Sequence, residues 1–131
     1  MPGWKDFRDI VAWQRARELK LRVDQLAQRP AVKTRFKFRD QLEDAARSAP
    51  SNIAEGFGRF GNKEFARFAR IAKASELEVL NHLIDAQDQG LITEEEFVQL
   101  EACVQSALAD PGTMEPRRRV FDTPFACRDS V

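Results

Sequence analysis

Residues 38–57 read FRDQLEDAARSAPSNIAEGF and contain an apolar residue at every third or fourth position. Such spacing is typical of a helix that buries one side. The apolar residues of this pattern are Phe38, Leu42, Ala45, Ala49, Ile53 and Phe57. Pro50 lies inside the pattern, but the spacing resumes at once. We therefore expect one helix, beginning near Arg35, with a kink at the proline rather than a break.

Glycines and prolines mark where this helix and its upstream neighbour end. Gly56, Gly58 and Gly61 predict the end of the helix and the turn that follows. Upstream, apolar residues recur at steps of three and four from about Asp9 to Gln28, which predicts another helix. Arg29-Pro30 ends it, because proline lacks an amide donor and disfavours helix in the residue before it.

Two more helices are predicted downstream. Asn62 is a candidate N-cap for a long helix over about 63–89, and Gly90 is its candidate C-cap. Thr93 and Glu96 have the spacing of a capping box, which predicts the start of a last helix.

The expected fold class is all-α. No segment alternates between apolar and polar residues, so no sheet is expected. Four helices with short connections favour an antiparallel up-down four-helix bundle with a kinked second helix and an irregular C-terminal tail. The bundle domain would cover residues 1–109. Residues 110–131 lack helical periodicity and are expected to form a tail that is flexible or docks on a neighbour.

The charged residues are divided unevenly along the chain. Residues 1–73 carry 17 Lys/Arg and 9 Asp/Glu, a net of +8, whereas residues 74–109 carry 8 Asp/Glu and no Lys or Arg. The remaining residues are balanced, so the net charge of the whole chain is zero. Such a split favours a basic surface for an anionic partner, or head-to-tail contacts between subunits.

The composition also argues against several classes of protein. Charged residues follow Met1 without the apolar stretch of a signal peptide, and no segment is apolar enough to span a membrane. Cys103 and Cys127 lie outside any metal-ligand spacing, so reduced thiols are expected. We expect a cytoplasmic protein without a metal, a cofactor or a membrane partner.

Three segments together resemble one known family. Residues 7–16, 41–56 and 64–78 are similar to the opening, the most distinctive motif and the third-helix pattern of the bacterial 23S rRNA intervening-sequence protein family, also called the four-helix bundle protein family. The similarity covers about residues 5–108. Its most specific part is the run Ser-x-Pro-x-Asn-Ile-Ala-Glu-Gly at 48–56.

The resemblance implies a homo-oligomeric bundle of five subunits and no enzymatic activity. Members of the family include proteins encoded within inserts of ribosomal RNA genes and accessory proteins of diversity-generating retroelements. The latter work with a reverse transcriptase and bind nucleic acid through a basic surface. The sequence departs from the family pattern in its tail and at Glu76, where an apolar residue is expected.

Basic residues in three segments are candidates for binding nucleic acid. The first group recurs every seven residues, and seven residues drift only ~20° around a helix axis, so its members form one stripe. The candidates are Arg8, Arg15, Arg22, Arg29, Lys33, Arg35, Lys37, Arg59, Lys63, Arg67 and Arg70. Such side chains bind phosphates, and this binding weakens with salt. The alternative is a solvated surface with local ion pairs.

A glycine motif at 56–61 spells G-x-G-x-x-G, but we favour turn glycines over a nucleotide site. A dinucleotide fingerprint needs a strand before it within a βαβ unit, and here a helix precedes it. A weaker version stays open, in which Arg59, Asn62 and Lys63 hold one phosphate at a helix N-terminus.

A polar stripe on the same helix consists of Gln41, Ser48, Asn52 and Glu55. We expect these residues to satisfy backbone groups freed by Pro50, or to bond to a neighbouring helix or subunit. The chain has one histidine, His82, so neither a nucleophile–base–orienter set nor a di-iron site can be assembled.

Glu76 falls near the centre of the apolar stripe of the third predicted helix. Burial without a partner would cost several kcal/mol. We therefore expect a partner such as Arg47, or a position at a subunit contact or central opening.

These observations favour a non-enzymatic, oligomeric accessory protein that binds RNA or DNA through a basic face, mainly by phosphate contacts. The alternative is a protein-interaction scaffold, for example for a reverse transcriptase, whose charge asymmetry serves subunit assembly.

Overall fold

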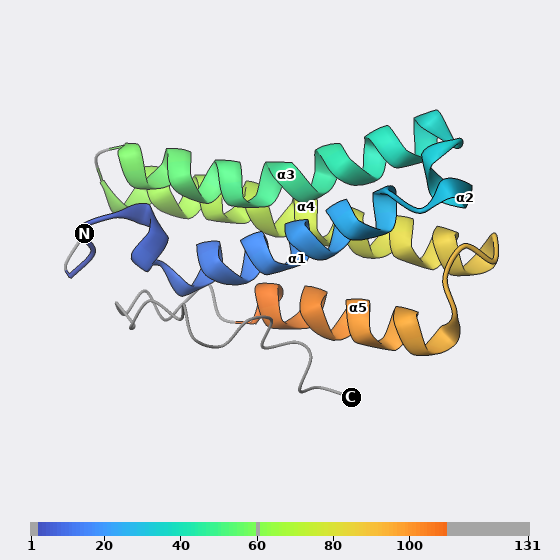
Figure 1. Cartoon of the computed structure of the whole chain (residues 1–131). Coiled ribbons are helices and arrows are strands. Elements are labelled where there is room, and N and C mark those ends of the chain that lie inside the picture. Colours follow the sequence, from blue (N-terminus) through green and yellow to red (C-terminus); the bar gives the residue numbers. More distant parts are fainter. Residues whose placement is uncertain (1–2, 60, 110–131) are drawn as a thin grey trace.

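The structure, a computed structural model, describes residues 3–59 and 61–109 of the chain (Figure 1). All regular secondary structure in this part is helical, which confirms the predicted all-α class. The elements are the 3-10 helix η1 (Phe7–Asp9) and the α-helices α1 (Val11–Ala27), α2 (Pro30–Lys33), α3 (Phe36–Gly58), α4 (Asn62–Asp88) and α5 (Glu94–Leu108). The predicted tail, residues 110–131, lies outside the described residues.

The four long helices lie side by side, and each packs against two of the others (Figure 1). Helices α3 and α5 each contact both α1 and α4. Helix α5 has 15 residues and α4 has 27, so α5 covers only part of the length of α4. Figure 1 shows α5 along the half that is nearer to α2. At the other end, Trp4 packs against Phe65, with ring centroids 5.3 Å apart.

The interior consists of two apolar clusters that follow each other along the helices. The cluster nearer α2 includes Leu19, Leu42, Leu83 and Val104. The cluster nearer the N-terminus includes Trp4, Ala16, Ile53, Phe65 and Ala72. Glu76 belongs to neither cluster, although its exposed fraction is only 3%. On α4 it lies between residues of the two clusters, so a carboxyl group is buried where the apolar interior is divided.

The four long predicted helices are confirmed, and their ends follow local rules. At the end of α4, Leu91 N–H donates to Ala86 O (2.9 Å) and Gly90 N–H donates to Gln87 O (3.0 Å), with Gly90 at φ 73°. This is a Schellman motif, in which only glycine tolerates the positive φ easily. The predicted capping box is also present, since Thr93 N–H and Glu96 N–H each donate to the other residue's side chain.

Two helix starts differ from the prediction. Pro30 ends α1, but it also begins the short helix α2, because its fixed φ suits the first position of a helix and no amide is needed there. At the start of α4 the N-cap is Gly61 (φ 101°), and Asn62 is already the first helical residue without a side-chain cap. The turn therefore uses the conformational freedom of Gly61 rather than the asparagine side chain.

Helix α3 continues through Pro50, as predicted, but it also continues through Gly56 to Gly58. Gly56 is therefore not a turn residue. It is buried, and a Cβ built on it would lie 2.8 Å from Cβ of Phe68 in α4. The glycine allows α3 and α4 to approach each other closely at this point.

Cys103 is buried and disulfide-bonded in the structure, so the predicted reduced thiol is wrong at this residue. A reduced thiol is expected because cysteines are usually reduced in the cytoplasm, and the residues around Cys103 do not indicate whether it is oxidised. Cys127 lies outside the described residues. Across residues 3–59 and 61–109, none of the helices is long and apolar enough to cross a bilayer.

Candidate nucleic-acid interface

The four arginines spaced by seven do not share one helix, because Arg8 lies in η1, Arg15 and Arg22 lie in α1, and Arg29 lies between α1 and α2. Arg8 donates to both carboxylate oxygens of Asp6 (2.8 and 2.9 Å). Arg15 donates to the main-chain oxygens of Ser106 (3.2 Å) and Ala109 (3.3 Å), at the C-terminal end of α5.

The other two arginines of the stripe lie further along the same side. Arg29 donates to both carboxylate oxygens of Glu96 and to the main-chain oxygen of Leu91. Arg22 is half-buried. Arg15 and Arg29 therefore attach α1 to the two ends of α5, a role that the seven-residue spacing alone did not indicate.

A second basic group lies at the corner between α2 and α3. Lys33, Arg35 and Lys37 are exposed, and none of them forms an ion pair within the part of the chain that the structure describes. Arg35 donates to the side-chain oxygen of Gln89 (2.6 Å). Arg39, next in the sequence, is neutralised by Asp40 (3.2 Å) and other partners. With the two carboxylates that contact Arg39, those of Asp40 and Glu43, residues 33–43 at this corner have a net charge of +2.

A third basic group lies on the first turns of α4. Lys63, Arg70 and Lys73 are exposed and form no ion pair among the described residues, although the charge of Lys73 acts on the buried carboxyl of Glu76. Arg67 stacks over the ring of Phe68 (4.6 Å) and lies 3.4 Å from Glu64. The steps of four, three and three between these basic residues place them along one side of the helix. Their exposure leaves the charges available to an anion.

Arg59, which precedes α4, forms an ion pair with Glu55 (2.8 Å), and this pair raises its pKa. The G-x-G-x-x-G reading is excluded here, since Gly56 and Gly58 lie within a helix and the described residues contain no strand. The weaker reading, one phosphate held by Arg59, Asn62 and Lys63, stays a prediction.

The predicted binding residues thus form three groups rather than one face. The corner group and the α4 group lie at opposite ends of α3, whose 23 residues extend about 34 Å. The second half of α4 carries Glu78, Asp85 and Asp88, all exposed. Helix α4 is therefore basic at its start and acidic towards its end.

One member of the polar stripe, Ser48, links α3 to α4. The amide of Asn52 donates to the main-chain oxygen (2.8 Å) and hydroxyl (3.0 Å) of Ser48. Ser75 of α4 donates from its hydroxyl to the hydroxyl of Ser48 (2.8 Å). Ser75 was not among the predicted members of this network, because nothing in the sequence pairs it with Ser48. Gln41 is exposed.

His82, the one histidine of the chain, lies in the second half of α4. His82 is half-buried, packs edge-on against Phe38 (centroids 6.3 Å apart) and has Glu78 at 3.8 Å. No cluster of three or more His, Cys, Asp or Glu residues could hold a metal ion within residues 3–59 and 61–109.

Glu76 is buried without a hydrogen-bond partner at Oε2. Burial raises the pKa of its carboxyl to about 8, because the charged form is poorly solvated there, and the nearby charge of Lys73 opposes this shift only in part. Arg47, the partner expected from the sequence, lies 3.3 Å from Asp44 instead.

Phe36 is an aromatic side chain on the surface that the sequence pattern does not predict. Phe36, at the start of α3, is 66% exposed. It lies between Arg35 and Lys37, and this position beside the basic residues is the sequence signal that could have identified it.

Comparison with known proteins identifies one family. The family described as 23S rRNA-intervening sequence protein matches residues 8–109. Neither a curated protein nor a solved structure matches the chain.

Proposed function

The chain belongs to the 23S rRNA-intervening sequence protein family, and from this premise we propose that it is a non-enzymatic, oligomeric accessory protein that binds RNA or DNA. The observation that carries the proposal is the start of α4, where Lys63 and Arg70 are exposed and form no ion pair in the described part of the chain. Binding is mainly to phosphates, and the site of action is the cytoplasm.

The basic side of α4 has dimensions that suit a nucleic-acid backbone. Ten residues separate Lys63 from Lys73, which corresponds to about 15 Å along the helix axis. Because each strand of a duplex carries one phosphate per ~3.4 Å of its axis, several phosphates fall within this length. Each contact releases a counterion and adds about 0.7–0.9 to the slope of log affinity against log salt concentration.

The test compares two variants that lose the same charge. In the first, Lys63→Gln and Arg70→Gln remove two cations without an acidic partner. In the second, Lys20→Gln and Arg47→Gln remove two cations that lie 2.7 Å from Asp24 and 3.3 Å from Asp44. Binding of fluorescent structured RNA and duplex DNA is measured by anisotropy across a salt series.

We expect the α4 variant to lose affinity and about 1.5 of the slope, whereas the control variant keeps both. Equal losses in the two variants would show that binding depends only on net charge. No binding by the wild type at low salt would overturn the proposal.

We also propose that α1, α3, α4 and α5 form an antiparallel up-down four-helix bundle with a kink at Pro50. The connections are short, which favours antiparallel neighbours. The arginine contacts support this for one pair. Arg15, in the first half of α1, contacts the last turn of α5, whereas Arg29, just beyond the end of α1, contacts its first turn.

The apolar residues left on the surface support the proposal of a homo-oligomer. Leu77 and Ile84 of α4 and Val98 of α5 are between 44% and 51% exposed. Apolar side chains in this arrangement favour burial against another copy. The resemblance to the family gives five as the proposed number of subunits. Light scattering of the wild type and of Leu77→Asp tests this, and a monomeric wild type would rule it out.

A protein-interaction scaffold is the second candidate function, and the division of α4 into a basic and an acidic half favours it. Opposite charges on one helix suit head-to-tail contact between copies, or docking of a protein such as a reverse transcriptase. Assembly that weakens with salt, without binding of nucleic acid, would support the scaffold over the accessory protein.

A further inference from the structure

Phe36 is the most exposed of the large apolar side chains in the described part of the chain. It is the first residue of α3 and is 66% exposed, whereas Phe38, two residues later, is only partly exposed and packs against the interior. An exposed phenylalanine gains nothing from burial within its own chain. Its ring is therefore available to a planar partner.

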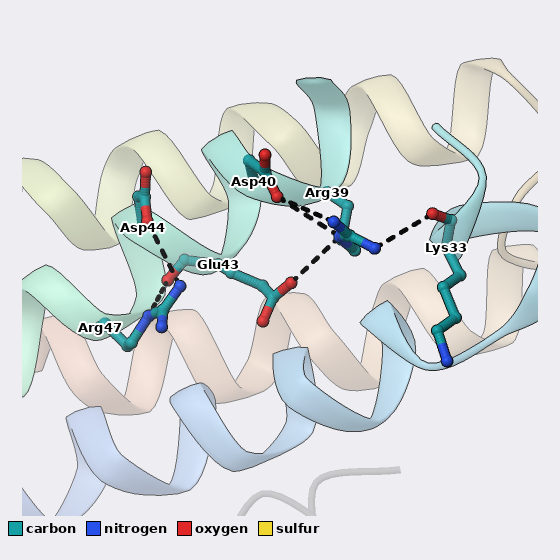
Figure 2. A network of polar contacts seen from close by, with 6 residues as sticks. All are labelled: Lys33, Arg39, Asp40, Glu43, Asp44 and Arg47. Atoms are coloured by element: carbon teal, nitrogen blue, oxygen red, sulfur yellow. Dashed lines mark hydrogen bonds and ion pairs between the residues drawn. The ribbon is translucent and has the colours of Figure 1, made fainter. Parts of the chain in front are cut away.

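One side of the Phe36 ring is already occupied by a fixed cation. The guanidinium of Arg39 lies over the ring, 5.4 Å from its centroid. Figure 2 shows how Arg39 is held: it contacts the carboxylates of Asp40 (3.2 Å) and Glu43 (3.5 Å) and donates to the main-chain oxygen of Lys33 (3.2 Å). These contacts keep Arg39 in place and limit the freedom that the ring would lose on binding.

The charges around the ring favour an anionic ligand. Lys33, Arg35 and Lys37 have no acidic partner within the described residues. Asp40 is exposed, but it and Glu43 are both engaged by Arg39. Residues 33–43 carry four positive charges and two negative ones, so the segment that holds the ring has a net charge of +2.

We infer that Phe36 is a stacking site for an unpaired base of single-stranded nucleic acid, with Lys33, Arg35 and Lys37 contacting the adjoining phosphates. An aromatic ring beside basic side chains is the combination with which proteins bind single strands, since every base offers a face for stacking. A base within a duplex is already stacked on both sides and cannot use the ring. The inference rests on the proposed function and adds the form of nucleic acid that is recognised.

The experiment measures binding of the full chain to a labelled single strand of about 12 nucleotides and to a duplex of the same length. The variants are Phe36→Ala, which removes the ring, and Phe36→Trp, which retains an aromatic face. Because Phe36 is exposed, neither change disturbs the interior, and thermal unfolding confirms this for each variant.

We expect Phe36→Ala to weaken single-strand binding about 10- to 100-fold and to leave duplex binding unchanged. Phe36→Trp should keep the single-strand affinity, and its added fluorescence should be quenched when the oligonucleotide binds. Equal losses on both substrates, no loss on the single strand, or a changed subunit number in Phe36→Ala would each overturn the stacking site. In those cases wild-type binding still supports the proposed function, whereas a wild type that binds neither substrate overturns both.

Discussion

Arg29, just beyond the end of α1, donates to both carboxylate oxygens of Glu96 in the first turn of α5. The same carboxylate accepts the main-chain N–H of Thr93 (3.0 Å) within the capping box. The bond from Arg29 is the main cause that lowers the pKa of Glu96 to about 2, and the bond from Thr93 adds to it. One side chain therefore caps α5 and attaches it to α1.

Loss of Glu96 should cost more stability than loss of Arg29. Glu96→Ala removes both the cap and the ion pair, for about 1–2 kcal/mol. Arg29→Ala leaves the capping box in place and removes the partly exposed pair and the bond to the main-chain oxygen of Leu91, for about 0.5–1 kcal/mol. Urea unfolding at neutral pH measures both values, and the double variant gives their coupling. Equal costs would show that the capping box contributes nothing.

The ion pair between Arg29 and Glu96 makes the stability of the folded chain depend on pH in the acidic range. A carboxyl with a lowered pKa stabilises the folded state above its unfolded value of 4.5, and this contribution is lost as the pH falls towards about 2. The wild type should therefore lose more stability than Glu96→Ala between these two pH values.

Glu76 should change the stability of the folded chain with pH in the opposite direction. The pKa of the Glu76 carboxyl is about 8 in the folded chain and 4.5 in the unfolded chain, so this carboxyl is protonated at neutral pH when the chain is folded. Its contribution to stability is full below 4.5 and is lost as the pH rises through about 8. Glu76→Gln, which cannot ionise, should be more stable than the wild type by about 2 kcal/mol at a pH near 9.

Unfolding in urea at a pH near 6 and near 9 tests this. Asp85→Asn is the matched control, because Asp85 is exposed on the same helix and should show no such gain. If Glu76→Gln were less stable than the wild type at the higher pH, the carboxylate would have a partner that stabilises its charge.

Gly56 and Gly58 offer a test of the close approach between α3 and α4. In Gly56→Ala the new Cβ would lie 2.8 Å from Cβ of Phe68, closer than such atoms come. We expect a loss of about 1–3 kcal/mol. Gly58→Ala meets nothing within 4 Å and should gain about 0.5–1 kcal/mol from better helix propensity. Thermal unfolding of the two variants compares them directly, and losses of similar size would contradict the packing role of Gly56.

The sequence was sufficient for the fold class because each long helix has its own apolar spacing. The sequence pattern does not predict helix α2, because Pro30 both ends one helix and begins the next. Glycine is common in turns, which favours a turn at Gly56, whereas the role of this residue depends on Phe68, 12 residues away in the next helix. Local patterns do not contain such contacts.

The candidate interface was less predictable for the same reason. The positions of the arginines could be read directly, but their partners could not, since 67 residues separate Arg29 from Glu96 and 91 separate Arg15 from Ser106. Exposure of Phe36 likewise depends on where α2 turns the chain. The second aromatic of this segment, Phe38, fits the helical spacing, and Phe36 does not.

Arg15 separates the two possible roles of the first-helix stripe. Its guanidinium donates to the main-chain oxygens of Ser106 (3.2 Å) and Ala109 (3.3 Å), which lie at the end of α5. Carbonyls at a helix end lack partners within the helix, so a cation that binds them stabilises that end. Arg15→Gln should therefore lower the free energy of unfolding by about 1 kcal/mol and leave the salt dependence of nucleic-acid binding unchanged.

Arg17→Gln is the control for this change. Arg17 is exposed on the same helix, over the ring of Trp13 at 5.9 Å, and its loss removes the same charge. We expect a smaller effect on stability, of at most about 0.5 kcal/mol. Urea unfolding and the salt series are measured on both variants. If Arg15→Gln instead reduced the salt slope while its stability matched that of Arg17→Gln, the stripe would bind phosphates, and its contact with α5 would be of little energetic importance.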